Sequence, residues 1–165
     1  MEGASEAVVP PQALRLGAVA PVPIAVLVLD QLTKWWVRAE LTLNDPLRIV
    51  GDNVRLLYIH NEGAAFGLSI GDHSSTLFLI LASAASVLVL YLLLATPPRD
   101  RVQRLALGLI LGGAVGNIVD RVRFGEVVDF IQVGVSGHYW PIFNVADSAV
   151  TVGAVLLGIA YLRAR

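Results

Sequence analysis

Long apolar stretches separated by polar segments form the dominant pattern of the chain. The first runs from Leu14 to Arg38 and turns polar after Asp30, and the second, from Thr76 to Thr96, contains no charged residue. Two shorter stretches follow, Leu105 to Val119 and Ser148 to Leu162. Because a membrane-spanning helix needs about 20 mostly apolar residues, the pattern predicts four spanning helices. Their expected bounds are about 14–38, 74–96, 102–122 and 144–163.

The two shorter stretches contain 15 residues each. At about 1.5 Å per residue they cover about 22 Å, which is less than the ~30 Å hydrocarbon core of a bilayer. Both helices must therefore continue into polar sequence on the side of Asp120 and Asp147. We expect these two carboxylates to lie at or below the membrane surface.

The segment between the first two helices, 39–73, has a different pattern. Turn signals at 44–46 (Asn-Asp-Pro) and 51–53 (Gly-Asp-Asn) separate short apolar runs, which is typical of strands. Residues 1–13 are mostly small, polar or proline, and we interpret them as a loose tail. The expected fold is a single membrane domain, 1–165. It is an all-α integral membrane protein, a four-transmembrane-helix bundle with a small extramembrane β-rich segment.

Composition agrees with this class and excludes others. The chain is 56% hydrophobic and 15% charged, with a mean hydropathy of +0.70, too apolar for a soluble domain. A net charge of -1 gives no reason to expect a nucleic acid as a partner. The absence of cysteine excludes thiol catalysis, and His60, His73 and His138 lack the spacing of a zinc-binding helix. No metal or cofactor is expected.

Arginines predict the orientation of the chain. Arg99, Arg101 and Arg104 lie between the second and third helices, and Arg163 and Arg165 follow the fourth. Basic loops favour the cytoplasmic side, which would place both termini in the cytoplasm. Most acidic residues lie on the opposite side, so we expect the chemistry there.

Two Asn-x-x-Asp pairs stand at the outer ends of the last two helices. Asn117 and Asp120 form one pair, Asn144 and Asp147 form the other, and Asp129 lies between them in the sequence. Residues three apart share a helix face. Carboxylates inside a membrane cost at least about 2.5 kcal/mol each, so they usually face the bundle interior and serve a function. Two neighbouring carboxyls that share one proton are the arrangement with which aspartic proteases activate water.

Simpler interpretations exist for each acid. Asp120 is best explained as an ion pair with Arg121, whereas for Asp147 a helix cap or dipole partner and a functional role are equally good interpretations. Asp129 is expected in a loop after the turn at Gly125. Spacing alone favours Asp120 with Asp147 as the active pair.

The remaining polar positions also have structural interpretations. Asp30 and Lys34 are four residues apart and predict an ion pair at the membrane interface, and Asn61 fits a turn. No serine with a neighbouring lysine base is present in an expected spanning helix. A small proton-coupled transporter and a non-catalytic scaffold remain alternatives, although the chain has no internal repeat.

Four segments, in this order, resemble the lipoprotein signal peptidase (signal peptidase II) family. They are DQLTKWWV, NEGAAFG, GNIVDRVRFGEVVDFI and FNVADSAVTVG, and the resemblance extends from about residue 25 to 155. It implies that Asp129 and Asp147 are the catalytic pair and that Asp120 is a supporting residue. Further site positions implied by the motifs are Asn117, Arg121, Asn144, Asn61 and Asp30.

The resemblance also implies a substrate and a location. The substrate would be a lipid-modified prolipoprotein, cleaved by an intramembrane aspartyl endopeptidase on the amino side of a diacylglyceryl cysteine. The protein would be a multi-pass monomer of the bacterial inner (cytoplasmic) membrane, in contact with membrane lipids. Its active site would lie near the outer leaflet, and the β-rich segment would hold the substrate near the surface.

Overall fold

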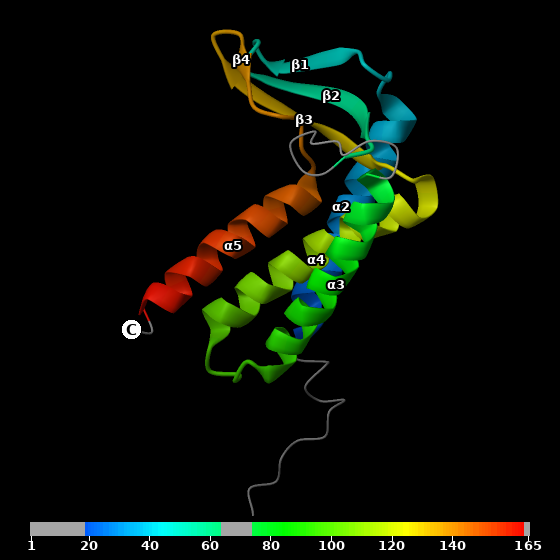
Figure 1. The fold of residues 1–165 in the computed structure, drawn as a ribbon. Coiled ribbons are helices and arrows are strands. Elements are labelled where there is room, and N and C mark those ends of the chain that lie inside the picture. The colour runs from blue at the N-terminus through cyan, green and yellow to red at the C-terminus, as the bar shows by residue number, and fades with distance from the viewer. Residues whose placement is uncertain (1–18, 64–73, 164–165) are drawn as a thin grey trace, which may run out of the picture.

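The computed structural model describes residues 19–63 and 74–163, which form a bundle of helices with a small sheet across one end (Figure 1). The expected tail at 1–13 and the last part of the β-rich segment lie outside the described residues. In chain order the elements are α2 (Pro21–Glu40), β1 (Pro46–Val50), β2 (Val54–Asn61), α3 (Ser74–Ala95), α4 (Arg101–Phe124), β3 (Val127–Val135), β4 (His138–Tyr139) and α5 (Val145–Arg163).

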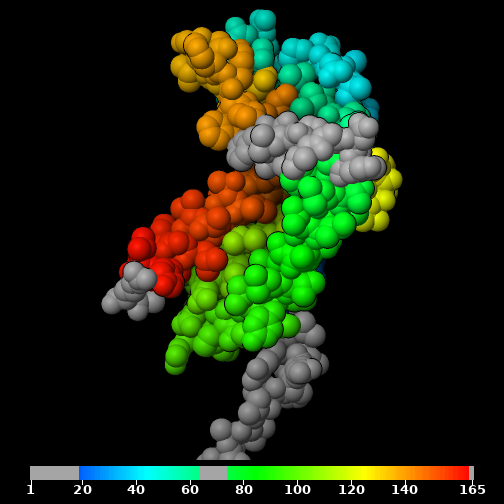
Figure 2. Space-filling model, viewed as in Figure 1, coloured from blue at the N-terminus to red at the C-terminus, as the bar shows by residue number. Residues whose placement is uncertain are grey.

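Helix α4 is the centre of the bundle, and α2, α3 and α5 each pack against it. In the space-filling view α4 is visible between α3 and α5, which diverge (Figure 2). Glycines make this close packing possible. A Cβ atom at Gly112 would lie 2.7 Å from the carbonyl oxygen of Pro23, and one at Gly153 would lie 2.7 Å from that of Ala106. Small residues at such contacts let helix backbones approach each other in lipid.

Three helices, α3, α4 and α5, are long and apolar enough to cross a membrane; the search covered the described residues only. Their outer surfaces are apolar, as at Val87 and Leu162, which are 70% and 71% exposed. Helix α2 carries charged residues from Asp30 onward, among them Lys34. The structure therefore shows four helices in the described part of the chain, three of them of membrane-spanning character, together with a small antiparallel sheet.

The sheet has the order β1-β2-β3-β4, with neighbouring strands antiparallel. The prediction of strands in 39–73 covers only β1 and β2. Strand β3 comes from the run VVDFIQVGV, so the expectation that Asp129 lies in a loop was wrong. This run of mainly β-branched and aromatic residues is bounded by Gly125 and by the turn at 136–137, and those features are a strand signal.

A hydrophobic cluster attaches the sheet to the helices. Val37 of α2 is buried with Tyr58 of β2 and with Val128 and Phe130 of β3. Strand β3 therefore starts against the end of α2, and its polar residue Asp129 is placed next to the bundle.

Gly113→Ala tests the glycine packing of α4. The new Cβ would overlap the carbonyl oxygen of Ala146 and lie 2.8 Å from Cγ2 of Val150, both on α5. We expect a loss of about 1–3 kcal/mol of stability, the usual effect of overpacking. Gly158→Ala is the matched control, because a Cβ there meets nothing within 4 Å. It should be neutral or stabilise by up to about 1 kcal/mol. Thermal unfolding in detergent measures both, and equal melting temperatures for the two variants would contradict the packing argument.

Candidate active site

The N-terminus of α5 is built by a reciprocal pair of hydrogen bonds. The backbone N–H of Asp147 donates to Oδ1 of Asn144 (2.9 Å), and the backbone N–H of Asn144 donates to Oδ2 of Asp147 (3.2 Å). This is a capping-box geometry, with an aspartate in place of the more usual glutamate, and it satisfies N–H groups that have no partner inside the helix. Asp30 adds to the cap, because its Oδ1 accepts the N–H of Ala146 (3.0 Å). The capping interpretation of Asp147 is therefore confirmed.

Asp129 lies on β3 and is 2% exposed. Its Oδ1 accepts a hydrogen bond from Nδ2 of Asn144 (2.7 Å), and its Oδ2 accepts one from Nδ2 of Asn61 (2.7 Å). Asn61 also accepts the backbone N–H of Gly63 on its Oδ1 (2.9 Å), so it shapes a turn as expected. The side chain of Asn61 thus both shapes the turn and contacts Asp129.

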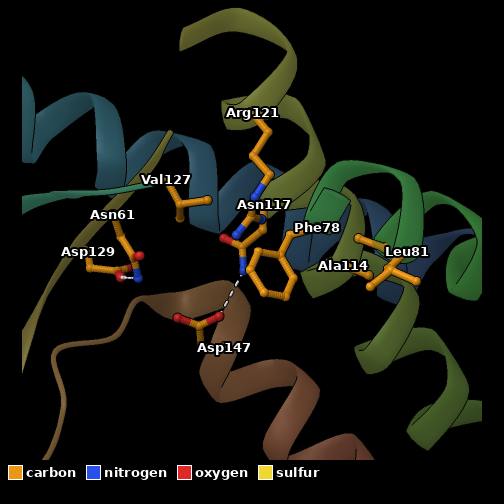
Figure 3. Close-up of a pocket in the computed structure, with 10 residues that line it drawn as sticks. Asn61, Phe78, Leu81, Ala114, Asn117, Arg121, Val127, Asp129 and Asp147 are labelled. Atoms are coloured by element: carbon orange, nitrogen blue, oxygen red, sulfur yellow. Dashed lines mark hydrogen bonds between the residues drawn. The ribbon is translucent and has the colours of Figure 1, made fainter. Parts of the chain in front are cut away.

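Asn117 of α4 connects the two carboxylates. Its Nδ2 donates to Oδ1 of Asp147 (2.8 Å), and its Oδ1 accepts from Nδ2 of Asn144 (3.1 Å). Asn144 in turn donates to Asp129. Figure 3 shows Asp129 beside Asn61, and Asp147 beside Asn117, at the same pocket. The structure therefore brings Asp129 and Asp147 into one hydrogen-bonded network.

A charged cluster lies behind this network. Nζ of Lys34 is 2.9 Å from Oδ2 of Asp30 and 3.0 Å from Oδ2 of Asp120, and it donates to Oδ1 of Asn117 (2.9 Å). All three charged side chains are 0% exposed, so the ion pair expected at the interface is an interior one. Asp120 pairs with Lys34, and the prediction that its ion-pair partner is Arg121 was wrong. Lys34 reaches Asp120 because the Gly116 turn lets α2 approach α4 closely.

Sequence reasoning missed two residues of this site, Lys34 and Gln31. Nε2 of Gln31 donates to Oδ1 of Asp120 (3.0 Å) and to Oδ2 of Asp30 (3.2 Å). The sequence did contain a signal for Lys34. It stands four residues after Asp30 in an apolar helix, and ionisable side chains in such helices usually face the bundle interior.

Arg121 lies at the pocket. Its Nη2 donates to the carbonyl oxygen of Gly63 (2.8 Å), whereas its Nε is buried and has no hydrogen-bond partner among the described residues. A buried guanidinium N–H without a partner is available to a ligand.

Two pockets meet at Asp147. The first has a volume of about 290 Å³. One wall is polar, with Asp129, Asp147 and Arg121, and the other is formed by apolar residues of α3 and α4, including Phe78 and Leu81. A second pocket, of about 540 Å³, lies along α5 and shares Asn117 and Asp147 with the first. Within 19–63 and 74–163, no group of three or more His, Cys, Asp or Glu side chains could hold a metal ion.

The electrostatics favour a proton on Asp129. Burial raises the pKa of Asp129 from its ordinary value of 3.8 to about 7, and the negative charge of Asp147 adds to this effect. Hydrogen bonds from Asn61 and Asn144 and the charge of Lys34 act in the opposite direction. One protonated carboxyl beside one carboxylate can act as general acid and general base in the same step.

The fold and the site together define a class: a helical membrane protein with a buried carboxyl pair suited to hydrolysis. Comparison with known families agrees. The family described as Signal peptidase (SPase) II matches residues 22–163, and the chain belongs to this family of peptidases.

Relatives and solved structures cover most of the chain. The lipoprotein signal peptidase of Syntrophotalea carbinolica is 43% identical over 139 residues, which are 84% of this chain and 86% of the relative. That of Symbiobacterium thermophilum is 42% identical over 134 residues, 81% and 87% of the two chains. A bacterial membrane enzyme solved by the in meso method superimposes with a TM-score of 0.80 at 32% identity, covering 90% of this chain and 89% of that chain.

Asn61→Leu tests the electrostatics of Asp129. The amide of Asn61 favours the ionised form, so its removal should raise the pKa of Asp129 above about 7. A hydrogen bond to a charged group contributes about 1.5–3 kcal/mol, so we expect an upward shift of about one pH unit or more. Infrared titration of the protonated carboxyl measures the shift, and Asp129→Asn identifies the band. An unchanged or lower midpoint would contradict the assignment.

Proposed function

We propose that this protein removes signal peptides from prolipoproteins, with Asp129 and Asp147 as its aspartyl pair. The bond that it cleaves lies on the amino side of a cysteine that carries a diacylglyceryl group. Membership of the signal peptidase II family supports this peptidase activity. One observation supports the residue assignment: Asn117 and Asn144 hold these two carboxylates in one buried network beside a pocket.

The geometry suggests a role for each carboxyl. Asp147 accepts hydrogen bonds from Nδ2 of Asn117 and from the backbone N–H of Asn144 at the N-terminus of α5. It is the base that takes a proton from water as the water oxygen attacks the scissile carbonyl. Protonated Asp129 donates its proton to the carbonyl oxygen. As the C–N bond breaks, Asp147 returns its proton to the leaving nitrogen and the diol proton returns to Asp129.

The other site residues support this pair. Asn61, Asn117 and Asn144 orient the carboxyls, and the free Nε–H of Arg121 binds a backbone carbonyl of the substrate. Asp120 and Asp30 hold α2, α4 and α5 together. All of these residues come from one chain, so a monomer is sufficient, and no cofactor is required.

Helix α2 is proposed as the fourth crossing. Its 20 residues cover about 30 Å, the thickness of the hydrocarbon core. Its charges at Asp30 and Lys34 are fully buried, and its outer surface is apolar, with Val28 and Leu32 50% and 58% exposed. The exposed Trp35 lies near its end, where tryptophans mark the membrane interface.

This arrangement sets the orientation in the bacterial inner membrane. The basic connection between α3 and α4 and both termini would face the cytoplasm. The sheet and the active site would then lie at the outer leaflet. A lipid-anchored substrate diffuses in the bilayer and would enter the apolar pockets laterally, with membrane lipids as neighbours. The whole chain, 1–165, would act as one membrane domain.

Asp129→Asn and Asp147→Asn should each abolish cleavage, with a loss of at least about 10³-fold, since each removes one of the two proton carriers. The assay is cleavage of a diacylglyceryl prolipoprotein by purified protein. Near wild-type cleavage by either variant would overturn the pair.

Asp120→Asn is the matched variant, because it alters a buried acid outside the pair. It weakens the contacts to Lys34 and to the N–H of Val128 (3.2 Å). We expect reduced thermal stability and a smaller loss of activity. Complete loss of cleavage in a well-folded Asp120→Asn protein would place this residue in the catalytic pair instead.

Cysteine labelling tests the orientation. The chain has no cysteine, so single substitutions need no altered background. Asp52→Cys in the β1–β2 turn replaces a side chain that is 62% exposed, and Arg99→Cys in the α3–α4 connection replaces one that is 86% exposed. An impermeant maleimide should label the first in intact spheroplasts and the second only after permeabilisation. The reverse pattern would invert the topology.

A further inference from the structure

We propose that Lys34 is a positioning residue that orients the Asn117 amide toward Asp147 and so fixes where the negative charge of the carboxyl pair resides. The inference rests on the proposed function of Asp129 and Asp147, because it concerns that pair. Lys34 lies on α2, and it reaches neither carboxyl of the pair by a hydrogen bond.

The ammonium group of Lys34 uses its complete bonding capacity. A lysine has three N–H donors and no acceptor. Three acceptors surround Nζ: Asp30 at 2.9 Å, Asp120 at 3.0 Å and Oδ1 of Asn117 at 2.9 Å. Two of these are charged partners, and the third is a neutral amide that belongs to the active-site network. The ion pairs hold the cation in place, and its remaining N–H points to Asn117.

This contact, together with the Nδ2 donor of Asn144 (3.1 Å), determines which end of the Asn117 amide faces Asp147. Because Lys34 only donates, the amide must present its oxygen to Lys34, and its NH₂ group then donates to Oδ1 of Asp147 (2.8 Å). The opposite orientation would place the amide oxygen against a carboxylate and the NH₂ group against the ammonium. The contact from Lys34 therefore keeps a hydrogen-bond donor facing Asp147.

A contribution to the stability of the fold is only a weak reason for a lysine at position 34. Replacing a buried ion pair by apolar residues of similar volume is often neutral or stabilising. An apolar residue would leave the Asn117 oxygen held by Asn144 alone, whereas the ammonium group gives it a second, charged donor.

The charges around Lys34 come from every element packed at this point. They are Asp30 on α2, Asp120 and Arg121 on α4, Asp129 on β3 and Asp147 on α5. The positive charge of Lys34 lowers the pKa of Asp129, against the effect of burial. Its removal should therefore allow the pair to keep its proton to higher pH.

The test uses Lys34→Met together with Asp30→Asn, which removes one charge of each sign. Asparagine at position 30 can still accept the N–H of Ala146 through its side-chain oxygen. In cleavage of a lipidated prolipoprotein we expect kcat to fall by about 10²-fold, as for a misplaced catalytic group, with KM changed less than about threefold. The alkaline limb of the kcat/KM profile should move to higher pH by about one unit.

Gly153→Ala is the structural control, because a Cβ there meets the Ala106 backbone at 2.7 Å, away from the network. It should lower the melting temperature and leave the pH limb of the folded enzyme in place. A Lys34 variant with the same behaviour, a lower melting temperature with a native pH limb, would overturn the inference. If the methionine variant does not accumulate, Lys34→Gln with Asp30→Asn removes the charge and places an amide, which can donate or accept, against Asn117, so the donor-only contact is lost. The same upward shift supports the inference there, and its absence overturns it.

Infrared titration of Asp129 gives a readout that does not depend on activity. Its midpoint should rise in the Lys34 variants, and a native midpoint would contradict the inference. Asp129→Asn, assayed in parallel, distinguishes a failure of the proposed aspartyl pair from a failure of the proposed role of Lys34. Cleavage by Asp129→Asn would overturn the aspartyl pair itself. An inactive Asp129→Asn together with a native pH profile in the Lys34 variants would overturn only the role of Lys34.

Discussion

The buried polar side chains at the sheet end of the bundle bond largely across elements, because a polar group buried without a partner is costly. Asn144 shows this constraint most directly. It is 0% exposed, its oxygen accepts the N–H of Asp147, and its NH₂ group faces Asp129, Asn117 and the carbonyl of Val128. One amide thus joins α5, β3 and α4. An unpaired buried polar group costs about 1–3 kcal/mol, so the network forms as a unit.

The glycines of α4 follow from the same constraint. A hydrogen bond between helices requires the two backbones to be close, and a Cβ at Gly116 would lie 2.6 Å from Oδ2 of Asp30. A larger residue there would displace the carboxylate that binds Lys34 and caps α5 at Ala146. The small residues therefore have two effects: they pack the helices in lipid, and they admit the charged cluster into the interior.

The sequence predicted those features that depend on local pattern. The bounds of α3, 74–96 expected and Ser74–Ala95 observed, follow from a long run without charge. The pairing of Asn144 with Asp147 is a three-residue spacing at a helix start, and it is visible without a structure. Contacts between residues far apart in the sequence could not be predicted from local pattern. The partner of Asp120 is 86 residues away in the sequence, at Lys34, whereas its neighbour Arg121 points to Gly63.

The two carboxyls of the proposed pair therefore owe their positions to different parts of the fold. Asp147 is placed by the cap of its own helix. Asp129 is placed by strand register, since β3 pairs with β2 so that Asp129 lies opposite Ile59 and Asn61 lies opposite Val127. A slip of one residue would turn Asp129 to the other face of the sheet, away from both of its amide donors. Spacing along the chain cannot show this, and it is why spacing favoured Asp120 as the partner of Asp147. The small sheet is thus part of the geometry of the proposed pair, because without its register the helices would present only one of the two carboxyls.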